Sequence, residues 1–324
     1  LEKQWLHFRS EKWPIPVLTT LTSLGTVNDL CGVTLSEALD VYVRLKGGEK
    51  GIKFIRHATR STNYAIEAVG DHDLTSYDGK ARGVLRDALL DRGLVSSSAK
   101  RVFASVRAMV NFVICEYGLK ATNPFLHVFF PELNDTKKRM PFSTMEVRLL
   151  HDKCRSTDDD VRHLAALISD TGVRLAEATG LKVSDIKIGG PIPYIHIRPN
   201  PIRRLKTKQS ERQVPLIGAS LWAAKRILAT SSGDYAFPRY VKNGTCLANS
   251  ASATLNKWIR SNIGNDLVVH SMRHKFRDRL REVVCPPEIT DSLGGWSRNS
   301  IGESYGDGYS LKAKHEWLSK ITLE

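Results

Sequence analysis

The sequence predicts a mainly α-helical protein with a small β-sheet, divided into a helical N-terminal domain and a mixed α/β C-terminal domain. Three observations support this prediction. Apolar residues recur at helical spacing along most of the chain, two short β-branched segments occur only in its second half, and a basic segment, LNDTKKRMPFS at residues 133–143, separates the halves. At 324 residues the chain is long enough for two domains.

The helical domain is expected at residues 33–132. It follows a lead segment, residues 1–32, that has mixed polarity and no clear periodicity. The sequence ATNPF at 121–125 breaks the helical pattern and closes the domain. After a first helix near its start, further helical runs are predicted at residues 58–70, 77–92 and 97–117.

Capping patterns indicate where two of the helices begin or end. Thr34 followed by Glu37 matches a capping box, which predicts the start of the first helix. The pair Gly47–Gly48 is expected to end that helix. Farther along the chain, Gly172 is expected to end a helix at 161–171.

The C-terminal domain is expected at residues 144–324, and Ser143 or Thr144 caps its first helix. Alternating β-branched residues predict short strands at 193–199 and 212–216, joined by the basic turn RRLKTKQSER. Helices are predicted at residues 161–171, 219–230, 250–262 and 271–284, with a last helix-like run at 311–321.

The charge of the chain is unusual for a globular protein of average composition. Lys and Arg number 48 against 34 Asp and Glu, which gives a net charge of +14 and a pI near 9.6. Such an excess indicates a polyanionic partner. Nucleic acid is the leading candidate, and an anionic membrane surface is the second.

The cysteines and the apolar segments indicate the compartment. The five cysteines are scattered and form no CxxC pair, so we expect neither a disulfide framework nor a zinc cluster, and we expect a reducing environment. No apolar run approaches the ~18 residues of a membrane span. The N-terminal LEKQWLHFRSEKW lacks the apolar core of a signal peptide. We therefore expect a cytoplasmic protein.

The segment HSMRHKFRDRLREVV, which begins at His270, combines a buried helix face with an anion-binding pattern. His270 and Arg273 are three residues apart, so they share a second face near the helix N-terminus, where free N–H groups favour anions. By themselves, a histidine and an arginine at this spacing usually occur by chance and are exposed to solvent. The buried face is formed by residues at helical spacing, Met272, Phe276, Leu280 and Val283 or Val284.

A second arginine stands in TGVRLAEATGL at residues 171–181. Glu177 lies one turn after Arg174, so its carboxylate is placed to orient the Arg174 guanidinium through charge-assisted hydrogen bonds. The alternative is a surface ion pair of little energetic value.

Further basic residues lie in two connecting segments. Lys206 and Lys208 occupy the tip of the predicted hairpin, where a lysine can contact a backbone phosphate or donate a proton to a leaving oxygen. The interdomain segment carries three basic residues that would contact phosphates beside a polyanion, Lys137, Lys138 and Arg139.

Together, these motifs resemble those of the tyrosine recombinase (phage integrase) family. The helical first half ending in NPF, TGVRLAEATGL, KTKQSERQVPL and HSMRH follow that family's order, from about residue 34 to the end of the chain. The resemblance implies a helical core-DNA-binding (SAM-like) domain followed by a tyrosine recombinase catalytic domain. The catalytic residues that it implies are Arg174, Lys206, His270, Arg273, Trp296 and Tyr305.

The nucleophile is expected in LGGWSRNSIGESYGDGYS, residues 293–310. In the family, a histidine or tryptophan after an LG sequence precedes the nucleophilic tyrosine by nine residues, a spacing that matches Trp296 and Tyr305. Tyr309 fits this spacing less well and is expected to be a packing residue. Most members of the family would have LGH where this chain reads LGGW, so the resemblance defines the role of Trp296 less closely.

The family's chemistry implies cleavage and rejoining of DNA through a 3′-phosphotyrosyl intermediate, with no metal or other cofactor. By resemblance, the partners are a specific double-stranded DNA site and three further copies of the chain in a tetramer, with DNA-bending proteins as candidate accessory factors. The expected role is integration or excision of a mobile element such as a phage or genomic island. The lead segment is expected to link to a further N-terminal DNA-binding module.

Two alternatives remain open at the level of the sequence. A type IB topoisomerase resembles this family in chemistry but relaxes supercoils without exchanging partners. A basic DNA-binding protein without catalysis would keep the Arg and Lys residues but would not need Tyr305. Lys206 is the preferred general acid, and Lys208 is its alternative.

Overall fold

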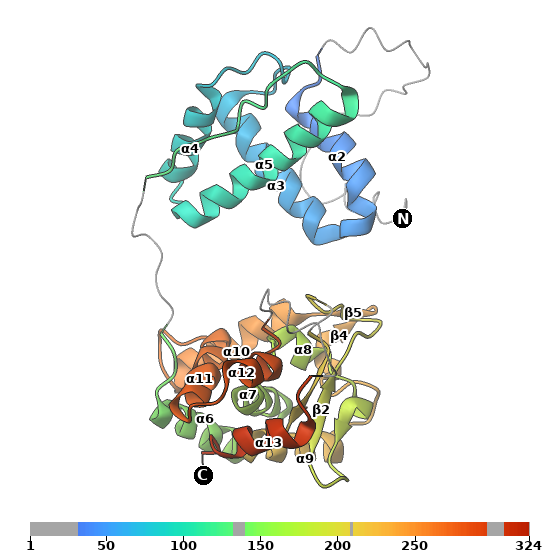
Figure 1. The fold of residues 1–324 in the computed structure, drawn as a ribbon, viewed down its shortest axis with the longest axis vertical. Helices are drawn as coiled ribbons and strands as arrows, with labels where there is room; N and C mark the ends of the chain where they lie inside the picture. The colour runs from blue at the N-terminus through green and yellow to red at the C-terminus, as the bar shows by residue number, and fades with distance from the viewer. Residues whose placement is uncertain (1–31, 132–139, 208–209, 297–307, 324) are drawn as a thin grey trace. The chain divides into compact units, whose positions relative to one another are not determined.

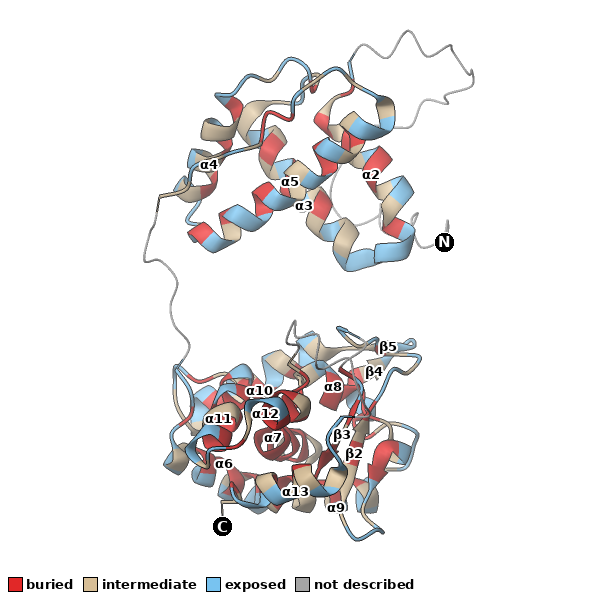
Figure 2. Cartoon of the chain, in the orientation of Figure 1, coloured by how far each residue is buried: buried red, intermediate tan, exposed pale blue. Residues whose placement is uncertain are grey.

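The computed structural model describes residues 32–131, 140–207, 210–296 and 308–323 (Figure 1). The chain divides into two compact units, residues 1–137 and 138–324, each with its own buried apolar cluster (Figures 1 and 2). No helix among the described residues combines the length and the apolar character needed to cross a bilayer. As the sequence predicts, the fold is mainly helical with a small amount of β-sheet.

The described part of the N-terminal unit is helical. Thr34 forms the predicted capping box, in which its side chain accepts from the Glu37 N–H and the Glu37 carboxylate accepts from the Thr34 N–H. Phe103 and Phe125 lie in the buried cluster, which all the described helices of the unit line. The helices are α2 (Leu35–Lys50), α3 (Ile52–Val69), α4 (Ala81–Asp91) and α5 (Ser96–Tyr117).

Three predicted boundaries in this unit are wrong, one of them the start of α4, which lies at Ala81 and not at residue 77. Helix α2 continues through Gly47–Gly48 to Lys50 and ends at Gly51, whose φ is 78°. A Cβ on Gly47 would lie 3.2 Å from the Ile55 side chain, so this glycine serves close packing between α2 and α3. Helix α3 accordingly begins at Ile52, earlier than the predicted start at 58.

The C-terminal unit combines helices with two small sheets. In the larger sheet, β2 pairs with both β1 and β3 in antiparallel fashion, and Ile195 faces Val214. The strands are β1 (Ile186–Lys187), β2 (Tyr194–Ile197) and β3 (Arg212–Pro215), with a separate hairpin of β4 (Val241–Lys242) and β5 (Thr245–Cys246). The helices are α6 (Thr144–Thr157), α7 (Asp160–Thr171), α8 (Leu175–Thr179), α9 (Gly218–Thr230), α10 (Ala248–Asn262), α11 (Val269–Glu282), α12 (Pro287–Gly294) and α13 (Leu311–Ser319).

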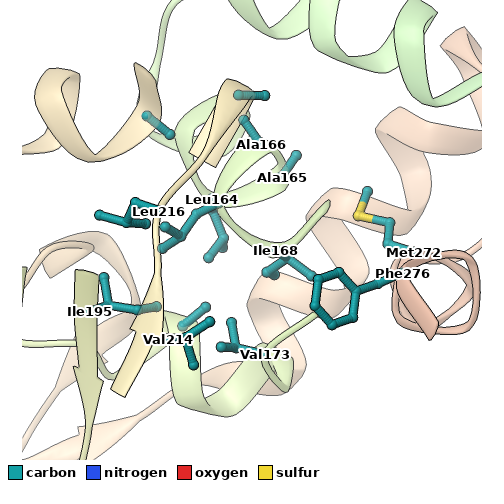
Figure 3. Close-up of a cluster of buried hydrophobic side chains, with 14 of the residues drawn as sticks. Leu164, Ala165, Ala166, Ile168, Val173, Ile195, Val214, Leu216, Met272 and Phe276 are labelled. Atoms are coloured by element: carbon teal, nitrogen blue, oxygen red, sulfur yellow. The ribbon is translucent and has the colours of Figure 1, made fainter. Parts of the chain in front are cut away.

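Helix α7 forms the centre of this unit. Val161 is buried, and so is every residue from His163 to Thr171. Figure 3 shows α7 side chains such as Ile168 packed between the sheet residues Ile195 and Val214 and the α11 residue Phe276. The burial of apolar groups on both sides of α7 fixes the ends of α7 and α11, and candidate site residues lie at these ends.

Helix α11 buries most of the predicted face. Met272, Phe276 and Leu280 are buried, and Val283 is half-buried against the same cluster. Val284, however, is 82% exposed, so Val283 is the one of the two predicted alternatives that lies on the buried face. The helix ends at Glu282, and the positive φ of Val284 (56°) turns its side chain away from the helical row.

Helix α13 and the residues that follow it pack against their own unit. Leu318 and Ile321 are buried in the C-terminal cluster. Buried Arg279 of α11 donates to the Ile321 carbonyl and, at 2.8 Å, to Oδ1 of Asp170 in α7. The end of the chain is therefore joined to the central helix through one guanidinium.

Candidate active site

Arg174 is placed by the break between α7 and α8. Helix α7 ends at Gly172, which has a φ of 60°, as the sequence predicts. Arg174 is the N-cap of α8, its backbone N–H donates to Glu177 Oε2 at 2.9 Å, and its Nη1 donates to Oε1 at 2.7 Å. The Arg174 side chain remains 26% exposed. It is thus held in place by Glu177 and still open to a ligand.

Glu177 is buried and also binds Arg212 of β3. Arg212 Nη2 donates to Glu177 Oε2 at 2.9 Å, and both side chains are almost fully inaccessible. Burial raises the pKa of the Glu177 carboxyl, but the charge of Arg212 and the hydrogen bonds from both arginines outweigh this, so the pKa lies below its ordinary value. The alternative of a weak surface ion pair is therefore wrong.

The importance of Arg212 was not predicted from the sequence, which placed it only at the start of a strand. The signal was a charged residue two positions before Val214 on the same face of a short strand, because a buried arginine needs a partner. Burial lowers the pKa of Arg212, and the charge of Glu177 opposes this shift.

Arg273 of α11 is distant from Arg174 in the sequence, but its side chain reaches the same region. Its side chain is buried, its Nη1 donates to the Gly172 carbonyl, and its Nη2 donates to the Gly294 carbonyl at 2.6 Å. Burial, followed by the positive charges of Arg174 and Arg212, lowers the pKa of Arg273 to about 9. Positive charge is therefore concentrated here, and an added anion would relieve the repulsion.

Three consecutive carbonyls at the end of α12 each accept from one of these arginines. The Leu293 carbonyl accepts from Arg212 Nε at 2.8 Å, the Gly294 carbonyl from Arg273 Nη2, and the Gly295 carbonyl from Arg174 Nη2 at 2.6 Å. The carbonyl end of a helix carries partial negative charge, which favours bound cations. We call the residues 293–295 the carbonyl turn.

Steric constraints explain why two residues of the carbonyl turn, Gly294 and Gly295, are glycines. Gly295 has a φ of 62°, and a Cβ there would lie 2.7 Å from Arg212 Nη1. A Cβ on Gly294 would lie 2.0 Å from the Trp296 ring. The main chain can therefore approach the guanidinium groups only where side chains are absent.

Trp296 lies directly after the carbonyl turn. The Cζ atoms of Arg273 and Arg277 are 4.5 and 4.7 Å from the centroid of its ring. Its backbone N–H donates to the Asp291 carbonyl at 3.0 Å. The structure thus joins four of the predicted site residues in one network, Arg174, Glu177, Arg273 and Trp296.

His270 and Lys206 are exposed, and neither is buried with the arginines. His270 lies in the first turn of α11, and its ring meets that of His274 edge to face at 5.0 Å. Lys206 lies in the connection between β2 and β3, next to Thr207. The hydroxyl of Thr207 is 3.0 Å from that of Ser210, which in turn accepts from Arg174 Nη1 at 3.3 Å.

The other predicted site residues lie outside the described part of the chain. These residues are Tyr305, Lys208, Lys137, Lys138 and Arg139. Among the described residues, no three His, Cys, Asp or Glu side chains are grouped so that they could hold a metal ion.

Comparisons with known proteins agree with this architecture. The tyrosine recombinase XerD of Corynebacterium glutamicum is 27% identical over 229 residues, which cover 66% of this chain and 71% of that protein. The Tn1549 transposon integrase, solved with transposon right-end DNA, matches the fold with a TM-score of 0.66 at 15% identity, covering 89% of this chain and 99% of that one. A lambda integrase tetramer bound to a Holliday junction gives a TM-score of 0.64 at 16% identity, covering 93% of this chain and 86% of that one.

A sequence model of the family described as the Phage integrase family matches residues 142–309, the region that contains the arginine network and the carbonyl turn. The match extends over more than half of the 324 residues. The chain therefore belongs to the phage integrase family.

Proposed function

We propose that this site-specific DNA recombinase cleaves DNA through Tyr305, while Arg174 and Arg273 neutralise the scissile phosphate. One observation carries the proposal. Two arginines distant in the sequence donate to the adjacent carbonyls of Gly295 and Gly294, immediately before the segment that contains Tyr305. The repulsion among Arg174, Arg212 and Arg273 supports an anionic ligand, because Glu177 is the only carboxylate to which the described contacts join them.

The two arginines suit the non-bridging oxygens of a phosphodiester. A guanidinium presents planar paired N–H donors that match phosphate oxygens. The Arg273 pKa of about 9 keeps this group charged at neutral pH. Both guanidiniums are already fixed by main-chain acceptors, so they need little reorganisation when charge builds up on phosphorus.

The covalent step balances without a cofactor. The Tyr305 phenolate attacks phosphorus, the bond from phosphorus to the 5′-oxygen breaks, and the Lys206 ammonium protonates that oxygen. His270 and Trp296 add hydrogen-bond donors to the phosphate, and His270 also assists proton transfer. Attack by a 5′-hydroxyl reverses the step, so the phosphotyrosyl bond conserves the energy needed for rejoining.

The net charge of +14 supports a wider DNA contact. We assign phosphate contacts to Lys208 and to the interdomain residues Lys137, Lys138 and Arg139, and DNA binding to the helical unit. The lambda integrase tetramer bound to a Holliday junction supports assembly of four copies on DNA, with integration or excision of a mobile element as the outcome. The DNA-bending accessory proteins belong to the same proposal.

The test begins with covalent capture. Wild-type protein is incubated with fragmented genomic DNA in EDTA, trapped with detergent, and the attached DNA is sequenced to define the site. Tyr305→Phe should then form no adduct with that site while binding it with nearly unchanged affinity. Tyr309→Phe is the matched control and should form the adduct normally.

Three results would redirect the assignment. An adduct that persists in Tyr305→Phe and disappears in Tyr309→Phe would move the nucleophile to Tyr309. Relaxation of supercoils without exchange between two captured sites would identify a topoisomerase instead, and binding with no adduct under any condition would identify a non-catalytic DNA-binding protein.

A further inference from the structure

Arg277 and Trp296 form a contact that the proposed chemistry leaves without a role. Arg277 lies four residues after Arg273 in α11, so the two side chains emerge from the same face of the helix. Both guanidiniums lie within 5 Å of the Trp296 ring centroid. Tryptophan attracts cations most strongly of the aromatic residues at separations below about 6 Å.

Asp291 ties Arg277 to the backbone at Trp296. Arg277 Nη2 donates to the buried carboxylate of Asp291 at 3.0 Å. The carbonyl of the same residue accepts from the N–H groups of Gly295 and Trp296. The end of α12, the indole and the Arg277 guanidinium are therefore fixed to one another through a single residue.

The position of Arg277 carries two costs. Its positive charge lies close enough to contribute to the lowered pKa of Arg273. Its Nε is buried and has no hydrogen-bond partner. The ion pair with Asp291 and the contact with the indole together offset these costs.

We propose that Arg277 is a positioning residue that holds the Trp296 indole against Arg273, and so keeps the Arg273 guanidinium aimed at the scissile phosphate. The inference rests on the proposed function for its effect on cleavage. The positioning of the indole itself is a structural matter that can be measured without DNA.

The first measurement is the fluorescence of Trp296. Because the chain has six tryptophans, the Trp296 signal is obtained by subtracting the spectrum of Trp296→Leu. Arg277→Met, compared with Arg277→Met/Trp296→Leu, should show a shifted Trp296 emission and stronger acrylamide quenching than wild type. The matched control is Arg281→Met in the same helix, since Arg281 pairs with Asp278 and has a 65% exposed side chain against 33% for Arg277.

The second measurement is the rate of covalent adduct formation on the captured site. Arg277→Met should slow it roughly 2- to 30-fold, the range expected for one cation–π contact. It should cause no further loss when Trp296 is already leucine. Arg277→Lys keeps a cation and should recover part of the rate, which also guards against a general folding defect.

Unchanged Trp296 emission in Arg277→Met would overturn the proposal, and so would equal slowing in the presence and absence of Trp296. If wild-type protein forms no adduct, the proposed function fails, while the fluorescence comparison still decides whether Arg277 positions the indole.

Discussion

Glu177 and Arg212 form a buried ion pair, with 2.9 Å between Glu177 Oε2 and Arg212 Nη2. The same carboxylate accepts from the backbone and the side chain of Arg174. One acid therefore stabilises a buried cation and orients a half-exposed one. Stability and site geometry are coupled at this residue.

Replacement of Glu177 should show how strongly this pair stabilises the C-terminal unit. Glu177→Gln leaves the Arg212 charge buried without a counterion, and we expect a loss of about 3–5 kcal/mol in the free energy of unfolding. Urea unfolding followed by tryptophan fluorescence measures it, because Trp222, Trp258, Trp296 and Trp317 all lie in this unit. Asp278→Asn, which breaks the exposed pair with Arg281, should cost less than about 1 kcal/mol. Similar losses in the two variants would contradict the prediction.

The buried His151 should make stability fall below neutral pH. Burial lowers the pKa of its imidazole, so the folded protein resists protonation that the unfolded chain accepts below about pH 6.5. The contribution is complete above that pH and is lost as pH falls toward the lowered folded pKa. His151→Gln should flatten the dependence of unfolding free energy on pH below about 6.5. The exposed His274 offers the control, and a steep slope that survives in His151→Gln would refute the assignment.

Gly172 should tolerate no side chain. An alanine Cβ would lie 2.2 Å from Phe276 Cδ1, and the φ of 60° is unfavourable for any other residue. Gly172→Ala should therefore cost about 2–5 kcal/mol of unfolding free energy, from overpacking and left-handed strain together. Gly244→Ala in the same unit has a φ of 65° but open space around it, so it should cost only about 1–2 kcal/mol. Equal costs would mean that the Phe276 contact relaxes freely.

Lys206 can be tested as the general acid through the leaving group. Lys206→Ala should slow cleavage about 10²- to 10⁴-fold on normal DNA. A substrate with sulfur in place of the leaving 5′-oxygen departs as a thiolate and needs no proton, so the variant should cleave it at nearly the wild-type rate. If the sulfur-containing substrate restores cleavage by Lys208→Ala but not by Lys206→Ala, Lys208 is the general acid.

Local signals predicted much of the fold correctly. The capping box at Thr34 and the helix end at Gly172 depend on residues within one turn, and each was found as predicted. Of the two caps predicted for α6, Ser143 or Thr144, the structure has Ser143. Gly47–Gly48 was misread because its packing partner, Ile55, belongs to the next helix. Helix α12 was not predicted, because eight residues between a proline and a glycine pair give too short a periodic signal.

The site was only partly predictable for a similar reason. Arg174 and Glu177 are one turn apart, so their contact follows from helical spacing. Arg212 and Arg277 bind acceptors in α12, and nothing in their local sequence indicates that distant partner. Main-chain carbonyls leave no trace in residue identity, so arginines that rely on them look like ordinary surface charges.

The carbonyl turn has a consequence for how this region tolerates substitution. Peptide oxygens at 293–295 are present whatever amino acid is encoded, so no point mutation can delete an acceptor there. Variants can act only by pushing the backbone aside. A saturation library at Gly294 and Gly295 should thus rank by side-chain bulk, with polarity contributing little to the order.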